Sequence, residues 1–304
     1  MLYISTRNNT DTYTAHRALH EEYAPDGGFY VPFYLPTFSS DALNYFTKKP
    51  AYETMAEILN LFFSVRLCAE DIEVAVGKNA LDCVNLNQNV SVVEFWHTTE
   101  GSSEYLFKKL NYLLSSDLQS PVGWPRVAIE ISLLFSMLGI CNQKAFDVAV
   151  SASDFASITA ISYAKAMGLP VQKTICACED DNEFWALVNK GECSTVNAPA
   201  YMELYLYKVM GGEVAANFVK VKEKSSTFYI EEERLPALLE QYYPAVVSHE
   251  RANSIINGIF RSNQYVFDFD AAFSYGSLQD YRASIGVNNQ TIIFSNKKPD
   301  RIKE

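Results

Sequence analysis

The chain has 304 residues, of which 48% are hydrophobic, and its 25 lysines and arginines against 36 acidic residues give a formal charge of −11. This length and apolar content are enough to bury a core, either as one large domain or as two ordinary ones. Because the excess of carboxylates repels phosphate backbones, we expect no nucleic-acid partner, although a locally positive pocket could accept a small phosphorylated ligand.

No segment of the sequence is typical of a membrane protein. The longest apolar helical pattern, residues 126–141, includes Glu130 and is too short to cross a bilayer. The start of the chain, MLYISTRNN, lacks the basic-then-apolar layout of a signal peptide. We therefore expect a soluble, cytoplasmic protein without a membrane partner.

Short β-rich runs alternate with helical patterns along the chain, which favours an α/β fold with a mostly parallel sheet flanked by helices. Glycines at position 168 and at 211–212 stand where C-terminal helix caps belong. In chain order, we predict a helix over 51–65, a strand over 91–95, a helix over 122–140, a strand over 145–151, a helix over 155–168, a strand over 171–179, a helix over 200–212, a strand over 226–230, a helix over 250–263, and strands over 264–270 and 291–295.

The domain organisation follows from the lack of obvious linkers. The chain contains no internal repeat, low-complexity tract or Pro/Gly/Ser-rich linker. The best candidate for a boundary is the polar stretch SSDLQSPVG at 115–123. We therefore predict two regions, 1–114 and 115–304, packed as one compact unit.

The six cysteines and four histidines are scattered along the chain. They form no CxxC pair and no zinc-ligand spacing, so we expect no metal site. Cys176 and Cys178 alternate on an apolar strand pattern, which places them on one face. We interpret them as buried free thiols in a reducing compartment.

The segment 151–168 reads as a strand, a turn of small residues and a helix. In α/β proteins this junction is the usual anion site, because the helix N-terminal N–H groups point at the turn. Here the turn has no glycine, and Asp154 adds negative charge where a phosphate would sit. We therefore predict that Asp154 is the N-cap of the helix.

A second candidate site is the amphipathic segment after residue 102, which contains Lys108 and Lys109. A lysine that forms a Schiff base must be partly desolvated to lower its pKa. Adjacent residues project about 100° apart on a helix, so at most one of the two lysines can face a cleft. The pattern is equally typical of two solvated lysines on a helix surface.

A third candidate is Ser295, at the carboxyl end of the last predicted strand. Its hydroxyl could form a hydrogen bond with a ring nitrogen of a ligand. The residue could equally do no more than end the strand.

Several motifs, in the same order along the chain, resemble threonine synthase, a pyridoxal-phosphate (PLP) enzyme of fold type II, the tryptophan-synthase-β-like fold. The most specific is the STR tripeptide of MLYISTRNN followed by YAPDGGFYVPFYLP, which is similar to the family's STR and LAPDGGLYVP. The other resemblances are EFWHTT to ELFHGPT, SPVGWPRVAIEISLLF to NSINWARI, ASDFASITAISYAKAMGLPV to SGNFGNILAGYYAKKMGLPI, VFDFDAAF to DPHTAV, and IIFSNKKPDRI to LATAHPAKF.

The resemblance implies where a cofactor site would lie and where it has changed. Aligned without a gap from His97, the family's Schiff-base lysine falls on Glu104; with a four-residue insertion it falls on Lys108. Both glycines of the family's phosphate loop are missing, and Asp154 replaces its asparagine, which opposes phosphate binding. The implied remnant of the cofactor site consists of His97, Ser153, Asp154, Phe155, Ala156, Ser157 and Ser295.

The resemblance also implies a small mobile domain, which the family places after the lysine motif and which is absent here between residues 116 and 120. Together these departures predict a degenerate, non-catalytic paralogue that has lost PLP and binds a partner protein or a small ligand. Surface left exposed by the missing domain could also form a homo-oligomer. The alternative is an active PLP-dependent threonine synthase, a carbon–oxygen lyase acting on a phosphohomoserine-like substrate, with Lys108 as the Schiff-base lysine.

Overall fold

The computed structural model describes residues 1–141, 145–178 and 182–299. At its centre is a six-stranded sheet with the strand order β10-β7-β6-β11-β5-β4. Every neighbouring pair in this sheet is parallel except β4 and β5, which are antiparallel. The predicted α/β fold with a mostly parallel sheet is therefore confirmed. The strands are β4 (Asp82–Asn87), β5 (Val90–Glu94), β6 (Phe146–Ser151), β7 (Val171–Cys178), β10 (Tyr242–Val246) and β11 (Thr291–Ser295).

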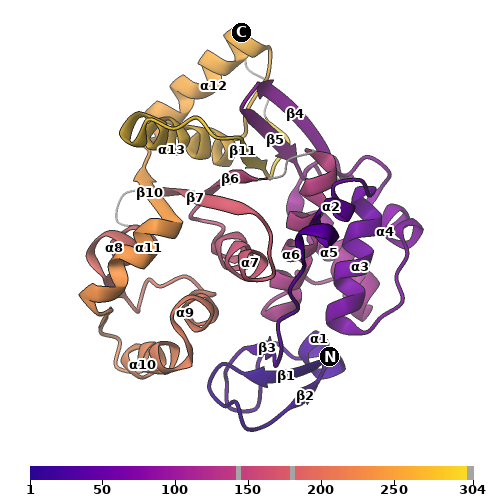
Figure 1. The fold of residues 1–304 in the computed structure, drawn as a ribbon, viewed down its shortest axis with the longest axis vertical. Coiled ribbons are helices and arrows are strands. Elements are labelled where there is room, and N and C mark those ends of the chain that lie inside the picture. Colours follow the sequence, from indigo (N-terminus) through magenta and orange to yellow (C-terminus); the bar gives the residue numbers. More distant parts are fainter. Residues whose placement is uncertain (142–144, 179–181, 300–304) are drawn as a thin grey trace.

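Helices cover both faces of this sheet (Figure 1). On one face lie α6 (Trp124–Ile140) and α7 (Phe155–Ala166), and on the other α12 (His249–Asn263) and α13 (Phe269–Ile285). Strands β5, β6 and β11 are buried along their whole length, as expected for strands covered on both faces. In the described part of the chain, no helix combines the length and apolarity needed to cross a membrane.

The alternation of side chains along β7 divides the core into two clusters. Cys176 and Cys178 pack in the larger cluster with α6 and α7, whereas Ile175 and Ala177 pack in the smaller one with α12 and α13. Both cysteines are buried and free. The predicted pair of buried thiols on one face is confirmed.

The larger core cluster contains residues from both sides of the predicted boundary at 115–123. It includes α3 (Ala51–Phe63), α4 (Ala69–Val76) and α5 (Ser103–Ser115) together with α6 and α7. Residues 116–123 connect the end of α5 directly to the start of α6. This short connection brings the first turn of α6 close to α5, so that Arg126 of α6 can contact Glu104 of α5.

Smaller elements flank the central sheet. The N-terminal part forms an antiparallel three-stranded sheet with the order β2-β1-β3, and β8 pairs with β9 in a separate two-stranded sheet. These elements are β1 (Leu2–Ser5), β2 (Tyr13–Thr14), α1 (Ala15–His20), β3 (Tyr30–Pro32), α2 (Ser40–Phe46), α8 (Glu183–Lys190), β8 (Glu192–Ser194), α9 (Met202–Met210), α10 (Gly212–Lys222), β9 (Thr227–Tyr229), the 3₁₀ turn Glu232–Arg234 and α11 (Leu235–Gln241).

One strand prediction was wrong, and one predicted strand lies outside the central sheet. Residues 264–270 do not form a strand, because Asp268 accepts a hydrogen bond from the backbone N–H of Ala271 and caps α13, which begins at Phe269. The run 226–230 does contain a strand, β9, but it pairs with β8 and lies outside the central sheet. Residue 179, the predicted end of β7, lies outside the described residues.

The two edge strands of the central sheet were missed. Half of the residues of β4 (DCVNLN) are Asp or Asn, and β10 (YYPAV) contains Pro244. Both features are typical of edge strands and weaken the sequence signal for a strand. The remaining predicted helices and strands agree with the structure to within about two residues at each end, which is the usual uncertainty of element boundaries.

Candidate functional site

The candidate site lies at the carboxyl edge of the parallel strands, where open α/β sheets bind their ligands. Strand β5 ends here at Glu94, β6 at Ser151 and β11 at Ser295. The N-terminus of α7 follows β6 after a three-residue turn. Most of the candidate residues from the sequence lie on these strand ends, on the segments that follow them or at the start of α7; the exceptions are Glu104 and Lys108, on α5.

The 151–157 turn is closed by its own side chains. Asp154 accepts hydrogen bonds from the Ser157 backbone N–H (3.4 Å) and from the Ser157 hydroxyl (2.9 Å), so it is the N-cap of α7, as predicted. The hydroxyl groups of Ser151 and Ser153 lie 2.8 Å apart. A carboxylate of the chain itself therefore accepts a hydrogen bond from a free N–H group at the N-terminal end of α7, where a phosphate would bind.

Phe155 and Ala156, two further positions of the phosphate loop, belong to the protein interior. Both are buried. The Phe155 ring packs edge-on against Phe184 and Tyr205, with centroids 5.4 Å away in each case. Both side chains are therefore part of the packed interior at the start of α7.

A buried arginine that the sequence did not single out reaches this turn. Arg126, in the first turn of α6, donates from Nε to Glu130 Oε1 at 2.5 Å, and its Nη2 lies 3.5 Å from Asp154 Oδ1. Its Nη1 lies 3.4 Å from Glu104 Oε2. The guanidinium also stacks on Phe107, with Cζ 3.6 Å from the ring centroid. We call Arg126, Glu104, Glu130 and Asp154 the Arg126 cluster.

The charges of the Arg126 cluster do not balance, because one guanidinium faces three carboxyl groups. Burial raises the pKa of Glu130 to about 7; Arg126 opposes this rise, whereas Asp154 adds to it. Burial by itself would lower the pKa of Arg126, but Glu130 and Asp154 hold it above its ordinary value. The cluster therefore has a net negative charge, and it keeps one carboxylate more than cations even when Glu130 is protonated. This charge repels a dianionic phosphate.

Little free space remains beneath this cluster. The cavity between α5, α6, α7 and the ends of β5 and β11 measures about 10 Å³. A single water molecule needs about that much volume, so this cavity is too small for an aromatic ring. The cavity is lined by Phe95, Phe107, Glu130, Met137, Ser157 and Phe294, among others.

The two candidates for the lysine position of the family lie one turn apart on α5. Glu104, whose side chain is 46% exposed, contacts Arg126 and accepts a hydrogen bond from the Ser120 hydroxyl. Lys108 is half-buried, and the neighbouring Lys109 places its Nζ 5.1 Å from the centroid of the Tyr105 ring. Arg126 faces the 151–157 turn, and Glu104 is connected to that turn through the Arg126 guanidinium.

Ser295 is fully buried at the end of β11 and uses its hydroxyl within the protein. It donates to Asp268 Oδ2 at 3.0 Å and accepts from Trp96 Nε1 at 3.0 Å. Asp268 also accepts the backbone N–H groups of residues 296 and 297. Burial raises the pKa of Asp268, while these hydrogen bonds lower it. Asp268 and Trp96 were missed because neither stands near Ser295 in the sequence.

His97 belongs to a separate group of side chains at the outer end of this edge. Its Nε2 lies 2.5 Å from Glu94 Oε2. Its ring stacks on that of Trp96, with centroids 4.0 Å apart. The structure thus groups the candidate residues as follows: Asp154 and Glu104 belong to the Arg126 cluster and Ser157 bonds to Asp154, Ser295 joins Trp96 and Asp268, and His97 joins Glu94 and stacks on Trp96.

Comparison with solved structures first defines the class. The chain superposes on the PLP-bound threonine synthase from Brucella melitensis with a TM-score of 0.82 at 16% identity, covering 98% of this chain and 89% of that chain. The yeast enzyme gives a TM-score of 0.80 at 14% identity (98% and 87%), and the Escherichia coli enzyme 0.72 at 14% identity (98% and 89%). The fold is that of the threonine synthases.

Sequence comparison then supplies the relationship. Residues 2–79 match the family model "Threonine synthase N terminus". A mouse protein, "Threonine synthase-like 2", is 27% identical over 120 residues, which is 36% of this chain and 24% of that protein. The matched region thus spans about a quarter of the curated relative's length. The resemblance predicted from the sequence is confirmed: the N-terminal part of the chain matches a threonine-synthase family model, and the fold is shared with threonine synthases.

Proposed function

We propose that this threonine-synthase-like protein is non-catalytic, does not hold PLP, and acts by binding a partner protein or a small ligand. One observation carries this proposal. Asp154 caps α7 at the position where a phosphate would bind, and the adjacent cation, Arg126, contacts three carboxyl groups of the chain itself. A phosphate would have to displace a carboxylate from the helix end and enter a site with excess negative charge.

The residues present do not fit the cofactor that the fold group implies. An aromatic ring with a phosphate needs a cleft, whereas the space between α5, α6 and α7 is filled by side chains to about 10 Å³. The hydroxyl of Ser295, the position that would contact a ring nitrogen, is held between Asp268 and Trp96. Both features support loss of the cofactor.

The connection between α5 and α6 supports a binding role. Residues 116–123 stand where the resemblance implies a small domain. Three large apolar side chains on or beside this connection are exposed: Tyr112 (49%), Leu118 (58%) and Val122 (44%). Large apolar side chains that are exposed in one short stretch of the chain are candidates for an interaction surface.

We further propose a cytoplasmic location for this protein. All six cysteines are free, and Cys83 and Cys141 keep their Sγ atoms 3.4 Å apart without a bond between them. Free thiols this close together would be prone to oxidation outside a reducing compartment.

The test is the visible absorbance spectrum of the purified chain during titration with PLP. We expect no stable band from an internal aldimine, and no lysine that borohydride reduction labels in preference to other surface lysines. Lys109→Ala is the matched control for Lys108→Ala, because the two lysines are adjacent on α5 and equally half-buried. A band that Lys108→Ala abolishes and Lys109→Ala preserves would instead support the active PLP enzyme.

A further inference from the structure

Two carboxylates face each other across the antiparallel pair at the edge of the central sheet. Asp82, the first residue of β4, lies directly opposite Glu94, the last residue of β5. Residues opposite each other in such a pair share one face, and like charges in this arrangement destabilise the sheet. Glu94 is also buried, at 4% exposure, which raises the cost of its charge. This pair therefore calls for a positive charge from elsewhere.

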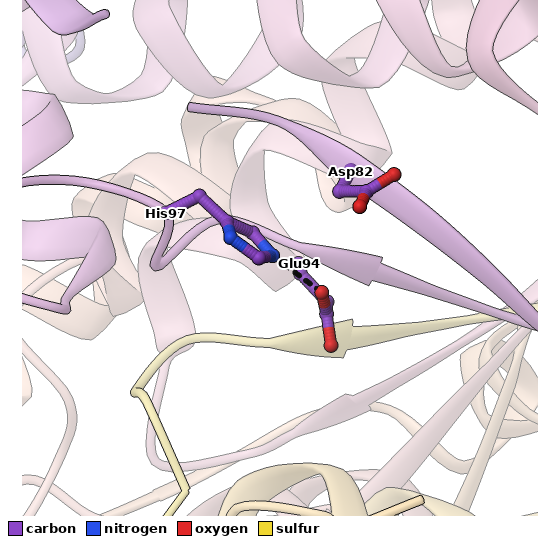
Figure 2. Close-up of side chains that lie close together, drawn as sticks. All are labelled: Asp82, Glu94 and His97. Carbon is purple, nitrogen blue, oxygen red and sulfur yellow. Dashed lines mark hydrogen bonds and ion pairs between the residues drawn. The ribbon is translucent and has the colours of Figure 1, made fainter. Parts of the chain in front are cut away.

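His97 completes a convergent group with these two residues (Figure 2). One ligand-type atom from each of Asp82, Glu94 and His97 lies within 4.8 Å of the others. Atoms bound at about 2 Å from one ion are roughly 3 to 4 Å apart, so small side-chain rotations would let all three contact the same ion. His97 already lies within hydrogen-bonding distance of Glu94, with Nε2 2.5 Å from Oε2.

Neighbouring side chains hold two of these residues in place. The Tyr265 hydroxyl donates to Glu94 Oε1 at 2.5 Å, and the other carboxylate oxygen, Oε2, lies next to His97. The Trp96 indole stacks on the His97 imidazole with an angle of 22° between the ring planes, while Trp96 Nε1 donates to Ser295. Hydrogen bonds to a ligating carboxylate and packing that orients a ligating histidine are the usual surroundings of a metal site.

We propose that Asp82, Glu94 and His97 bind a divalent transition-metal ion of the Zn²⁺ class. One imidazole nitrogen and two carboxylate oxygens form a mixed donor set that suits such ions, whereas Mg²⁺ and Ca²⁺ prefer oxygen ligands alone. A doubly charged ion neutralises the two carboxylates. Asp82 is exposed, which gives the ion a path from solvent. The site goes beyond the proposed function and does not rest on it.

The experiment is calorimetric titration of the chelator-treated full chain with Zn²⁺ as the probe. We expect one site, with affinity lowered more than about 10-fold by Asp82→Asn and by His97→Ala, and about 10-fold by Tyr265→Phe, since loss of a supporting contact alone typically costs 10- to 100-fold. Asp82→Asn changes an exposed residue, so it keeps the test valid even if His97→Ala does not fold. Co²⁺ in place of Zn²⁺ should give a visible d–d band that Asp82→Asn abolishes.

The chain offers a matched control on α1. His16 and His20 stand one turn apart with ring centroids at 4.1 Å, and such an exposed pair can bind Zn²⁺ by chance. We expect His20→Ala to leave the affinity unchanged. The proposal is overturned if no Zn²⁺ binds, if binding is lost in His20→Ala, or if it survives both Asp82→Asn and His97→Ala.

Discussion

At the carboxyl edge of the sheet, carboxyl groups lie close together at both the inner and the outer end, but the two ends differ in the cation that stands near them. At the inner end, next to α7, the carboxyl groups of Glu104, Glu130 and Asp154 surround the permanent cation Arg126. At the outer end, Asp82 and Glu94 face each other, and in the described part of the chain the side-chain hydrogen bonds of Glu94 are with an imidazole and a phenol. The difference shows that the carboxyl groups of the inner end already have a cation of the chain among them, whereas the outer end is suited to a cation from solution.

The largest expected effect comes from removing the cation of the inner end. Arg126→Met leaves Glu130, whose side chain is 5% exposed, without its counter-charge. Breaking a buried ion pair from one side destabilises a protein by about 3 to 5 kcal/mol, so we expect a loss of that order in urea unfolding at pH 8, above the pKa of Glu130 in the wild type. Arg17→Met is the matched control, because Arg17 also pairs with a glutamate four residues later but at the surface. An equal loss in both variants would contradict the special role of Arg126.

A somewhat smaller effect should appear in the pH dependence of stability. The pKa of Glu130 is raised from 4.5 to about 7 in the folded chain, so between these values the folded state holds a proton that the unfolded state has released. The contribution of Glu130 is therefore full below about pH 4.5 and is lost as the pH rises through 7, in total roughly 3 kcal/mol at 1.36 kcal/mol per pKa unit.

The measurement is urea unfolding between pH 5 and 8 for the wild type and for Glu130→Gln. The difference between the two proteins isolates this carboxyl group from the other titrating residues. We expect the free energy of unfolding of the wild type to fall more steeply with rising pH than that of Glu130→Gln. Parallel pH profiles would show that Glu130 does not titrate in this range.

At the outer end, an added ion should stabilise the fold. Zn²⁺ at 100 times its dissociation constant is expected to raise the free energy of unfolding by about 2.7 kcal/mol, or somewhat less if the unfolded chain also binds the ion. Thermal melts with Zn²⁺, and again after a chelator, would measure this gain and its reversal. Glu104→Gln, at the inner end, should retain this Zn²⁺-dependent stabilisation, whereas Asp82→Asn should lose it. The opposite pattern would mean that Zn²⁺ binds at the inner end and not at the outer end.

The smallest expected effect concerns the cap of α7. Asp154→Ala removes the acceptor for the Ser157 N–H and should destabilise the protein by about 1 kcal/mol, whereas Asp154→Asn keeps a capping oxygen and should cost less. Urea unfolding of both variants measures the difference. Equal losses would mean that Asp154 acts through its charge on Arg126 and not through the cap.

Much of the fold was predictable from local patterns. The buried strands β5, β6, β7 and β11 and the helices α3, α6, α7, α9 and α12 carry strong apolar periodicity, and Asp154 has the position and chemistry of an N-cap. The failures occurred where a local signal was overridden. An apolar run at 264–270 read as a strand, but the cap at Asp268 started a helix there instead.

Candidate site residues were predictable one at a time but not as groups. Asp154, Ser295 and His97 each stand at the end of a predicted strand or the start of a helix, so the sequence could place them at the sheet edge. Their partners come from distant segments: Arg126 meets Asp154 through the packing of α6 on α7, and Asp268 meets Ser295 across 27 residues.

The sequence by itself determined the mostly parallel α/β fold, the resemblance to threonine synthase, and the negative charge at the start of α7. Each of these depends on residue types at short spacing, because periodicity and capping act within a few turns. Tertiary structure decided which charges meet. Arg126 is enclosed by three carboxyl groups, and Asp82 faces Glu94, because helix packing and strand register bring together side chains that no local pattern connects.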